Sequence, residues 1–337
     1  MTDVVHGGLR DDERAPGVLD LSANLHPDGP PAAVLAALRS AEVDRYPSVD
    51  ARPLREALAA RHSVDPACVV VTPGASAAIY LASATLLAAG DRCVVFEPTF
   101  GEYARAVEAA GGVVVRSAAA PPDFSTMEVD ADAAWLCVPN NPTGLAATRH
   151  DLDALLSRTR HLLIDAAYAD LSEARWDTVD LVRTGAPVVV VGSMTKLFAI
   201  PGVRLGYIIA SAETATRLRD RQPPWPVGSA DIAVGLAALE GIEERLATVP
   251  ALHERRRRME RTFADLGVTC TRSSTNFVLA QVGDGPRFRG LMLARGVGVR
   301  DATSFGLPEW VRIAVPPEDA LPALIEAVTA VVQEMRG

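Results

Sequence analysis

Short runs of apolar, often β-branched residues alternate with helical patterns over the first two thirds of the chain. The runs lie at 69–71, 93–96, 113–115, 135–138, 162–164 and 188–191. Several are apolar at consecutive positions, which is typical of strands that are covered on both faces. The segments between them have the length of β-α crossovers, so the pattern predicts an α/β fold around a parallel sheet.

The final third of the chain has a different pattern. The proline-rich segment at 223–226 predicts a break before a long helix that begins near Ser229. A charged helical pattern follows over 240–266, and we interpret its arginine run at 255–258 as a solvated helix face. Strands are expected at 277–279 and 311–314, with helices near 286–295 and 317–335.

These patterns divide the chain into three parts. Residues 1–40 are expected to form an N-terminal arm and part of a small domain. Residues 41–235 should form a large domain, and residues 236–337 a small α+β domain. A chain of 337 residues is long enough for both domains to have a core of their own.

Composition narrows the class of protein. The chain is 49% hydrophobic and 22% charged, which is ordinary for a soluble globular protein. A net charge of -9 disfavours nucleic acid as a partner, although it is compatible with a local basic pocket for a small anion. The four cysteines form no C-x-x-C pair, so we expect neither a disulfide framework nor a metal site. No signal peptide or membrane span is apparent, from which we expect a cytoplasmic protein with no membrane partner.

Lys196 is the most informative polar residue. It comes after the apolar run at 188–191, at the strand end where open α/β sheets bind ligands. Lysine is seldom placed beside an apolar strand without a task. Ser193 and Arg204 flank it, and both could reach one phosphate, because arginine suits a forked contact. The spacing S-x-x-K followed by R-x-G-Y disfavours the alternative of a solvent-exposed lysine in a plain loop.

Two further predicted strands lead into polar residues. Asp165 follows the run at 162–164, and Tyr168 comes three positions later. A carboxylate at the end of a buried strand is costly unless it is paired. Asn141 lies in the turn at 140–144, which follows another predicted strand. Each feature alone is weak evidence, because such residues are common at strand ends and in turns.

Small residues and one aromatic residue follow the first two predicted strands. Gly74, Ala75 and Ser76 link a strand to a helix, where backbone N–H groups can cradle a phosphate. Phe100 lies just past the run at 93–96 and could stack on a flat ring. Taken by itself, Phe100 is better explained by core packing.

Together these groups match the parts that a pyridoxal 5′-phosphate (PLP) enzyme needs. Such an enzyme needs a lysine that carries the cofactor as a Schiff base, and Lys196 is the candidate. It needs an acid that keeps the pyridine nitrogen protonated, for which Asp165 is placed, and Tyr168 could donate to the phenolic oxygen. We therefore predict a PLP enzyme.

These segments, in this order, resemble the fold type I PLP enzymes of the aminotransferase class. The elements N-P-T-G, D-x-x-Y and S-x-x-K…R-x-G-Y carry the resemblance, which covers almost the whole chain. It implies a mostly parallel seven-stranded sheet with helices on both faces, as the PLP-binding large domain, plus a smaller α+β domain. The cofactor contacts that it implies are Gly74, Ala75, Ser76, Phe100, Asn141, Asp165, Tyr168, Ser193, Lys196 and Arg204, of which Lys196, Asp165 and Tyr168 would be catalytic.

The segment Arg-Tyr-Pro at 45–47 resembles the part of this family whose tyrosine reaches the phosphate bound by the partner subunit. The resemblance therefore implies a homodimer with shared active sites, in which Tyr46 completes the partner's site.

Within this class the chain resembles the L-threonine-O-3-phosphate decarboxylases of cobalamin biosynthesis. The likeness lies in H-G-G at 6–8, in D-x-S-x-N…G-P-P from 20 to 31, in the K-x-x-A-I-P-G that starts at Lys196, and in the two arginines near the end. The substrate contacts that it implies are His6, Asn24, Asn141, Arg300 and Arg312. Which arginine would bind the substrate's phosphate and which its carboxylate stays open.

The resemblance implies decarboxylation of L-threonine O-3-phosphate to (R)-1-aminopropan-2-ol O-phosphate and CO2. The alternatives are an aminotransferase for histidinol phosphate or an aromatic amino acid, and a related PLP enzyme of specialised metabolism. The H-G-G start favours decarboxylation. Two departures, Leu9 after H-G-G and Ala166 in D-A-A-Y, leave the exact substrate open. A non-catalytic PLP-binding regulator is disfavoured, because no basic helix-turn-helix precedes the sheet.

Overall fold

The computed structural model describes residues 7–118, 131–173 and 177–337, and its largest sheet has seven strands. In sheet order these are β2 Val69–Thr72, β8 Gly206–Ile209, β7 Val188–Ser193, β6 His161–Asp165, β5 Ala133–Cys137, β3 Arg92–Glu97 and β4 Val113–Ala118. Strand β8 is antiparallel to both neighbours, and the other neighbouring pairs are parallel. The predicted mostly parallel sheet is confirmed. The apolar runs did not predict β8, which is only four residues long and begins with glycine.

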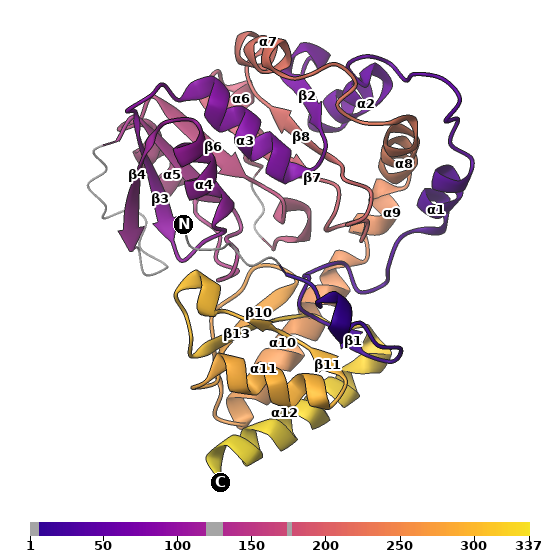
Figure 1. Cartoon of the computed structure of the whole chain (residues 1–337), viewed down its shortest axis with the longest axis vertical. Helices are drawn as coiled ribbons and strands as arrows, with labels where there is room; N and C mark the ends of the chain where they lie inside the picture. The colour runs from indigo at the N-terminus through magenta and orange to yellow at the C-terminus, as the bar shows by residue number, and fades with distance from the viewer. Residues whose placement is uncertain (1–6, 119–130, 174–176) are drawn as a thin grey trace.

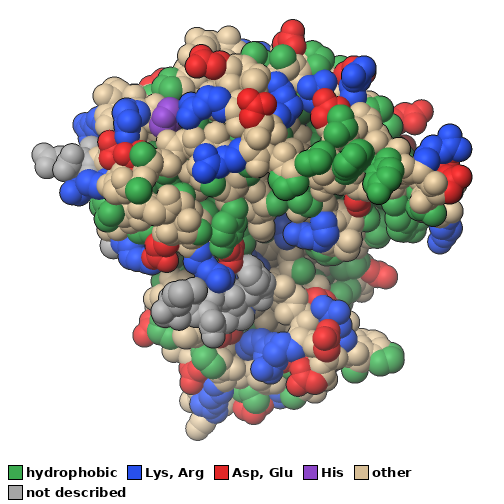
Figure 2. Space-filling model, turned by 45° about the horizontal axis from the view of Figure 1, so that its top comes forward, with side chains coloured by type: hydrophobic (Ala, Val, Ile, Leu, Met, Phe, Trp, Pro, Cys, Tyr) green, Lys and Arg blue, Asp and Glu red, His purple; other side chains and the backbone are tan. Residues whose placement is uncertain are grey.

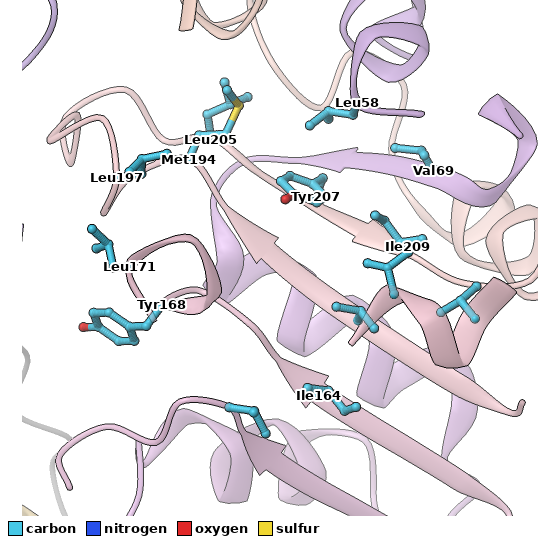
Figure 3. Packing of buried hydrophobic residues seen from close by; sticks show 14 of the residues in the cluster. Leu58, Val69, Ile164, Tyr168, Leu171, Met194, Leu197, Leu205, Tyr207 and Ile209 are labelled. Atoms are coloured by element: carbon cyan, nitrogen blue, oxygen red, sulfur yellow. The ribbon is translucent and has the colours of Figure 1, made fainter. Parts of the chain in front are cut away.

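Both faces of this sheet are covered, which explains why its strands are apolar at consecutive positions. Along β6, Leu162 and Ile164 pack into the core on one face, and Leu163 packs into the core on the other. Because side chains alternate between the faces of a strand, a strand buried on both sides must be apolar throughout. Figure 3 shows part of the first core, where Ile164, Tyr207 and Ile209 project from their strands.

The helices that flank the seven-stranded sheet contribute to these two cores. The first core receives side chains from α1 Ala32–Arg39, α2 Arg52–His62, α5 Arg149–Leu156, α6 Val179–Arg183 and α8 Ser229–Glu240. The second receives them from α3 Ala75–Leu86, α4 Glu102–Ala109 and α7 Ala212–Arg221.

A smaller part of the chain lies below this sheet in the view of Figure 1. Its antiparallel sheet contains, in order, β12 Arg300–Asp301, β13 Trp310–Ala314, β10 Phe277–Gln281 and β9 Thr269–Cys270. Helices α10 Val249–Asp265, α11 Gly285–Ala294 and α12 Leu321–Arg336 complete a third core with it. Strand β1 Leu19–Asp20 pairs in parallel with β11 Val297–Gly298, so the N-terminal segment joins this part.

We propose that the two parts are divided after α8, a few residues beyond the expected position 235. Helix α8 packs on α1 and α2, whereas α10 contacts β9 and β10. The short helix α9 Ile242–Leu246 lies between α8 and α10 and would be the connection.

The prediction of a solvated arginine run at 255–258 is wrong for half of the run. Arg256 is only 2% exposed, and its Nη2 donates to Glu173 at 2.7 Å. Arg255 is also buried, and it donates to Glu318 and to the carbonyl of Pro316. These two arginines lie on the inner side of α10, which the charge pattern alone does not distinguish from the outer side.

Within the described ranges, no helix is long and apolar enough to cross a membrane. The four cysteines are free: Cys93 and Cys137 are buried, and Cys68 and Cys270 are half-buried. In the same ranges, no group of three or more His, Cys, Asp or Glu side chains is arranged to hold a metal ion.

Candidate active site

A cavity of about 310 Å³ lies where β5, β6 and β7 end. Most of the residues expected at a site line it: Ala75, Ser76, Phe100, Asn141, Asp165, Tyr168, Ser193, Lys196, Arg204 and Arg312. The carboxyl ends of parallel strands meet at one edge of the sheet, so residues that are far apart in the sequence are brought together there.

Lys196 is the only lysine among the 33 lysine and arginine residues of the chain. Its Nζ donates to the carbonyl of Ala23 at 3.2 Å and lies 5.8 Å from the ring centroid of Tyr168. Burial, with the nearby charge of Arg312, lowers the pKa of Lys196 to about 8, against a smaller opposing effect of Asp165. The amine is therefore readily available in its neutral, nucleophilic form.

Asp165 is 4% exposed at the end of β6. Its Oδ1 accepts a hydrogen bond from the backbone N–H of Ala167, and its Oδ2 accepts one from the Tyr103 hydroxyl, both at 2.8 Å. Burial raises the pKa of Asp165, and these hydrogen bonds oppose that effect. No salt bridge to Asp165 forms within the described ranges, so a buried cationic group from a ligand would stabilise its charge.

The start of α3 forms an anion cradle. Gly74 precedes it with φ +85°, and a Cβ there would lie 2.9 Å from Nη2 of Arg204. A Cβ at Gly206 would lie 2.6 Å from the backbone nitrogen of Ala75. Gly74 thus allows the guanidinium of Arg204, and Gly206 allows strand β8, to lie close to the N-terminus of α3. The backbone N–H groups at this helix start, together with Ser76, can bind an anion. Gly74 itself does not line the cavity.

Arg312, on β13, is 4% exposed at the opposite side of the cavity. Its Nη2 donates to the carbonyl of Ser22 at 2.7 Å, its Nη1 donates to Oδ1 of Asn141, and its Nε has no partner. Burial lowers the pKa of Arg312 to about 10. It forms no salt bridge within the described part of the chain, so an anionic ligand would compensate its buried charge.

Arg300 lies directly opposite Arg312 in the pairing of β12 with β13. Its Nη2 donates to the hydroxyl of Ser304 at 2.6 Å. The ring centroid of Phe305 lies 5.6 Å from the guanidinium carbon of Arg300 and 6.0 Å from that of Arg312. Phe305 lines the cavity and Arg300 does not.

Two other expected site residues are not at the cavity wall. Asn24 is buried behind it, and its Nδ2 donates to the Tyr168 hydroxyl at 3.3 Å. Tyr46 is 82% exposed and packs on Trp225, with ring centroids 4.9 Å apart. His6 lies outside the described residues.

Among the residues that line the cavity, sequence reasoning missed the aromatic side chains of Tyr103 and Phe305. Tyr103 was read only as part of a helix, although its position three residues after Phe100 places it near the same strand end. Phe305 lies between the two arginines in the sequence and was not assigned a contact. The isolation of Lys196 as the single lysine was a further unused signal, because no other side chain could form a Schiff base.

Comparison with known proteins shows the family of this chain. The model of the family "Aminotransferase class I and II" matches residues 16–328. This chain belongs to that family. A histidinol-phosphate aminotransferase of Symbiobacterium thermophilum is 33% identical over 97% of this chain and 94% of its own length. A threonine-phosphate decarboxylase of Salmonella typhimurium is 32% identical over 74% of each chain. The crystal structure of L-threonine-O-3-phosphate decarboxylase from Porphyromonas gingivalis has a TM-score of 0.84 and 25% identity, over 94% of this chain and 100% of that one.

Class I and II aminotransferase-family enzymes use PLP, and the cavity fits this cofactor. The cradle at α3 suits the phosphate, and the buried Asp165 suits a protonated ring nitrogen. Asn141 and Tyr168 can approach the phenolic oxygen, and Lys196 can supply the amine. The aromatic ring of Phe100 at the cavity wall can stack on the cofactor ring.

The lowered pKa of Lys196 predicts how cofactor uptake depends on pH. PLP uptake by the PLP-free protein requires the neutral amine of Lys196. The rate of uptake should therefore rise with pH and level off above about pH 8, which is the pKa of Lys196 in the folded chain. If the lysine had its ordinary pKa of 10.5, the rate of uptake would instead keep rising between pH 8 and 10. Stopped-flow absorbance measures the rate, and Lys196→Arg, which leaves no lysine in the chain, is the control. A rate that still increases tenfold per pH unit between pH 8 and 10 would contradict the assignment.

Proposed function

We propose that this enzyme is a PLP-dependent decarboxylase of a phosphorylated amino acid. The proposed substrate is L-threonine O-3-phosphate, and the products are CO2 and (R)-1-aminopropan-2-ol O-phosphate, which would place the enzyme in cobalamin biosynthesis. A cytoplasmic location is part of the same proposal.

The pair of buried arginines carries this proposal. Arg300 and Arg312 occupy directly opposed positions on neighbouring strands, where like charges destabilise a sheet. The charge of Arg300 also contributes to the lowered pKa of Arg312. A substrate with both a carboxylate and a phosphate would supply two anions to this pair, whereas a simple monocarboxylic amino acid would supply one. The likeness to the two threonine-phosphate decarboxylases supports the same choice.

The residue roles are part of the proposal. PLP, when bound, supplies an electron sink for the carbanion left by loss of CO2. Asp165 would hold the proton on the ring nitrogen, and Tyr168 would donate to the phenolic oxygen. Arg312 and Asn141, already joined by a hydrogen bond, would bind and orient the carboxylate that is lost as CO2. Lys196 would then deliver a proton to Cα of the product.

A histidinol-phosphate aminotransferase is the second candidate function. The observation that favours it is the 33% identity, over 97% of this chain, to the enzyme of that name from Symbiobacterium thermophilum. The same cavity would serve: a phosphate would again meet an arginine, and Lys196 would move a proton from Cα instead of delivering one after loss of CO2. Fold alone does not distinguish the two reactions.

The reaction can be assigned by direct assay of purified, PLP-loaded enzyme. With L-threonine O-3-phosphate we expect release of CO2 and of aminopropanol phosphate in equal amounts, measured by trapping of CO2 and by mass spectrometry. Lys196→Ala should lose at least about a thousandfold in rate, because it removes the proposed nucleophile and proton donor. Absence of CO2, together with conversion of the cofactor to its pyridoxamine form by histidinol phosphate, would replace the decarboxylase by the aminotransferase.

The two arginines predict a second result. Arg312→Gln and Arg300→Gln should each lower kcat/KM for threonine phosphate about 10- to 100-fold, because a charge-assisted hydrogen bond contributes roughly 1.5–3 kcal/mol. The exposed Arg287 of α11 provides a matched control, and Arg287→Gln should leave the kinetics unchanged. Equal kinetics for the wild type and both arginine variants would rule out the proposed anion contacts.

We also propose that two copies form a dimer in which Tyr46 completes the partner's site. Large apolar side chains are exposed at Leu38, Val43, Tyr46, Val49 and Trp225. Figure 2 shows hydrophobic side chains gathered on the side of the molecule where α1, α2 and α8 lie. Monomers rarely leave such a patch uncovered.

Light scattering tests the dimer. The wild type should have twice the chain mass of 35.6 kDa, and Val43→Asp, which places a charge in the proposed interface, should shift the protein toward the monomer. Tyr46→Phe should remain dimeric but bind PLP more weakly, because it lacks the hydroxyl that would reach the phosphate. A wild-type mass of one chain would refute the shared site.

A further inference from the structure

Tyr103, at the start of α4, lines the cavity and is fully buried from solvent. Its hydroxyl donates to Oδ2 of Asp165 at 2.8 Å. The pKa of Tyr103 is well above its ordinary value, because burial and the charge of Asp165 both disfavour the phenolate. The hydroxyl is thus a permanent donor to the carboxylate.

The position of Tyr103 is fixed by its ring. The ring stacks on Trp135 at 5.2 Å with an interplanar angle of 12°. Nε1 of Trp135 in turn donates to Ser83 at 3.0 Å, and both of these residues are buried. Stacking and burial leave the phenol little freedom, so the direction of the hydroxyl is set by the second core.

The two hydrogen bonds on Asp165 leave room for a third partner. A carboxylate has about four lone-pair positions, and the backbone N–H of Ala167 and the Tyr103 hydroxyl use one on each oxygen. Both donors hold the carboxyl plane in one orientation while a lone pair remains free to face the cavity. The same tyrosine meets the ring of Phe100 edge-on, with centroids 5.7 Å apart and planes at 79°.

We infer that Tyr103 is a positioning residue, which orients the Asp165 carboxylate toward the ring nitrogen of PLP and keeps it ionised. Tyr103 does not touch the reacting atoms. It acts through Asp165, and its removal leaves a buried carboxylate oxygen without a donor. A hydrogen bond to a charged group in a dry site is among the stronger ones in proteins.

The variant Tyr103→Phe tests this role, because it removes one oxygen and keeps the stacked ring. We expect the Kd for PLP, from absorbance titration, to rise about 10- to 100-fold. The visible band of bound PLP, which depends on protonation of the ring nitrogen, should shift. The melting temperature of the PLP-free protein should stay close to that of the wild type.

Tyr80→Phe is the matched control. The Tyr80 hydroxyl also donates to a carboxylate, Oε2 of Glu102 at 2.7 Å, but neither residue lines the cavity. Tyr80→Phe should therefore leave the Kd and the spectrum of bound PLP unchanged. If Tyr103→Phe behaves like Tyr80→Phe in both measurements, the inference is overturned.

A double-mutant cycle with Asp165→Asn separates positioning from packing. If the hydroxyl acts through the carboxylate, Tyr103→Phe should change the Kd less than twofold once Asp165 is an asparagine. An equal loss of affinity in both backgrounds would mean that Tyr103 supports the cavity only by packing, and would overturn the role proposed here.

Discussion

The rest of the site depends on a carboxylate, Asp165, that is buried at the end of a central strand. Removing a charge from water is costly, and no salt bridge within the described residues offsets the cost. Two hydrogen-bond donors and the charge of Lys196 lower the pKa of Asp165 and so stabilise its ionised form. A cationic ring nitrogen bound in the same cavity would complete the compensation.

The N-terminal segment connects the cavity to the smaller part of the chain. Three consecutive residues each contact a different site residue: the carbonyl of Ser22 accepts from Arg312, that of Ala23 accepts from Lys196, and Asn24 donates to Tyr168. The carbonyl of Asn24 accepts in turn from Asn276. The N-terminal segment is thus hydrogen-bonded both to residues that follow strands of the large sheet and to Arg312 of the smaller sheet.

Much of the site could be predicted because the residues that directly follow parallel strands lie at the same edge of the sheet. That rule is local, and it needs only the apolar runs and the polar residue after each run. It placed Asp165 and Lys196 at one edge without knowledge of the strand order. It could not place Tyr103, whose hydroxyl reaches Asp165 from 62 positions away in the sequence. The separate prediction from the charge pattern, a solvated arginine run, was wrong for Arg255 and Arg256, because a run of arginines does not reveal which side of a helix faces another part of the chain.

The sequence by itself determined the class of fold and the cofactor, and it predicted Lys196 as the lysine that carries the cofactor. These conclusions follow from short-range patterns: consecutive apolar positions for strands that are covered on both faces, small residues at a helix start, and a lysine after an apolar strand. Tertiary structure decided the rest: the hydrogen bonds on Asp165, the opposition of Arg300 and Arg312, and the exposure of Tyr46. These features depend on which distant segments pack together, and packing of that kind is fixed by the whole core rather than by neighbours in the sequence.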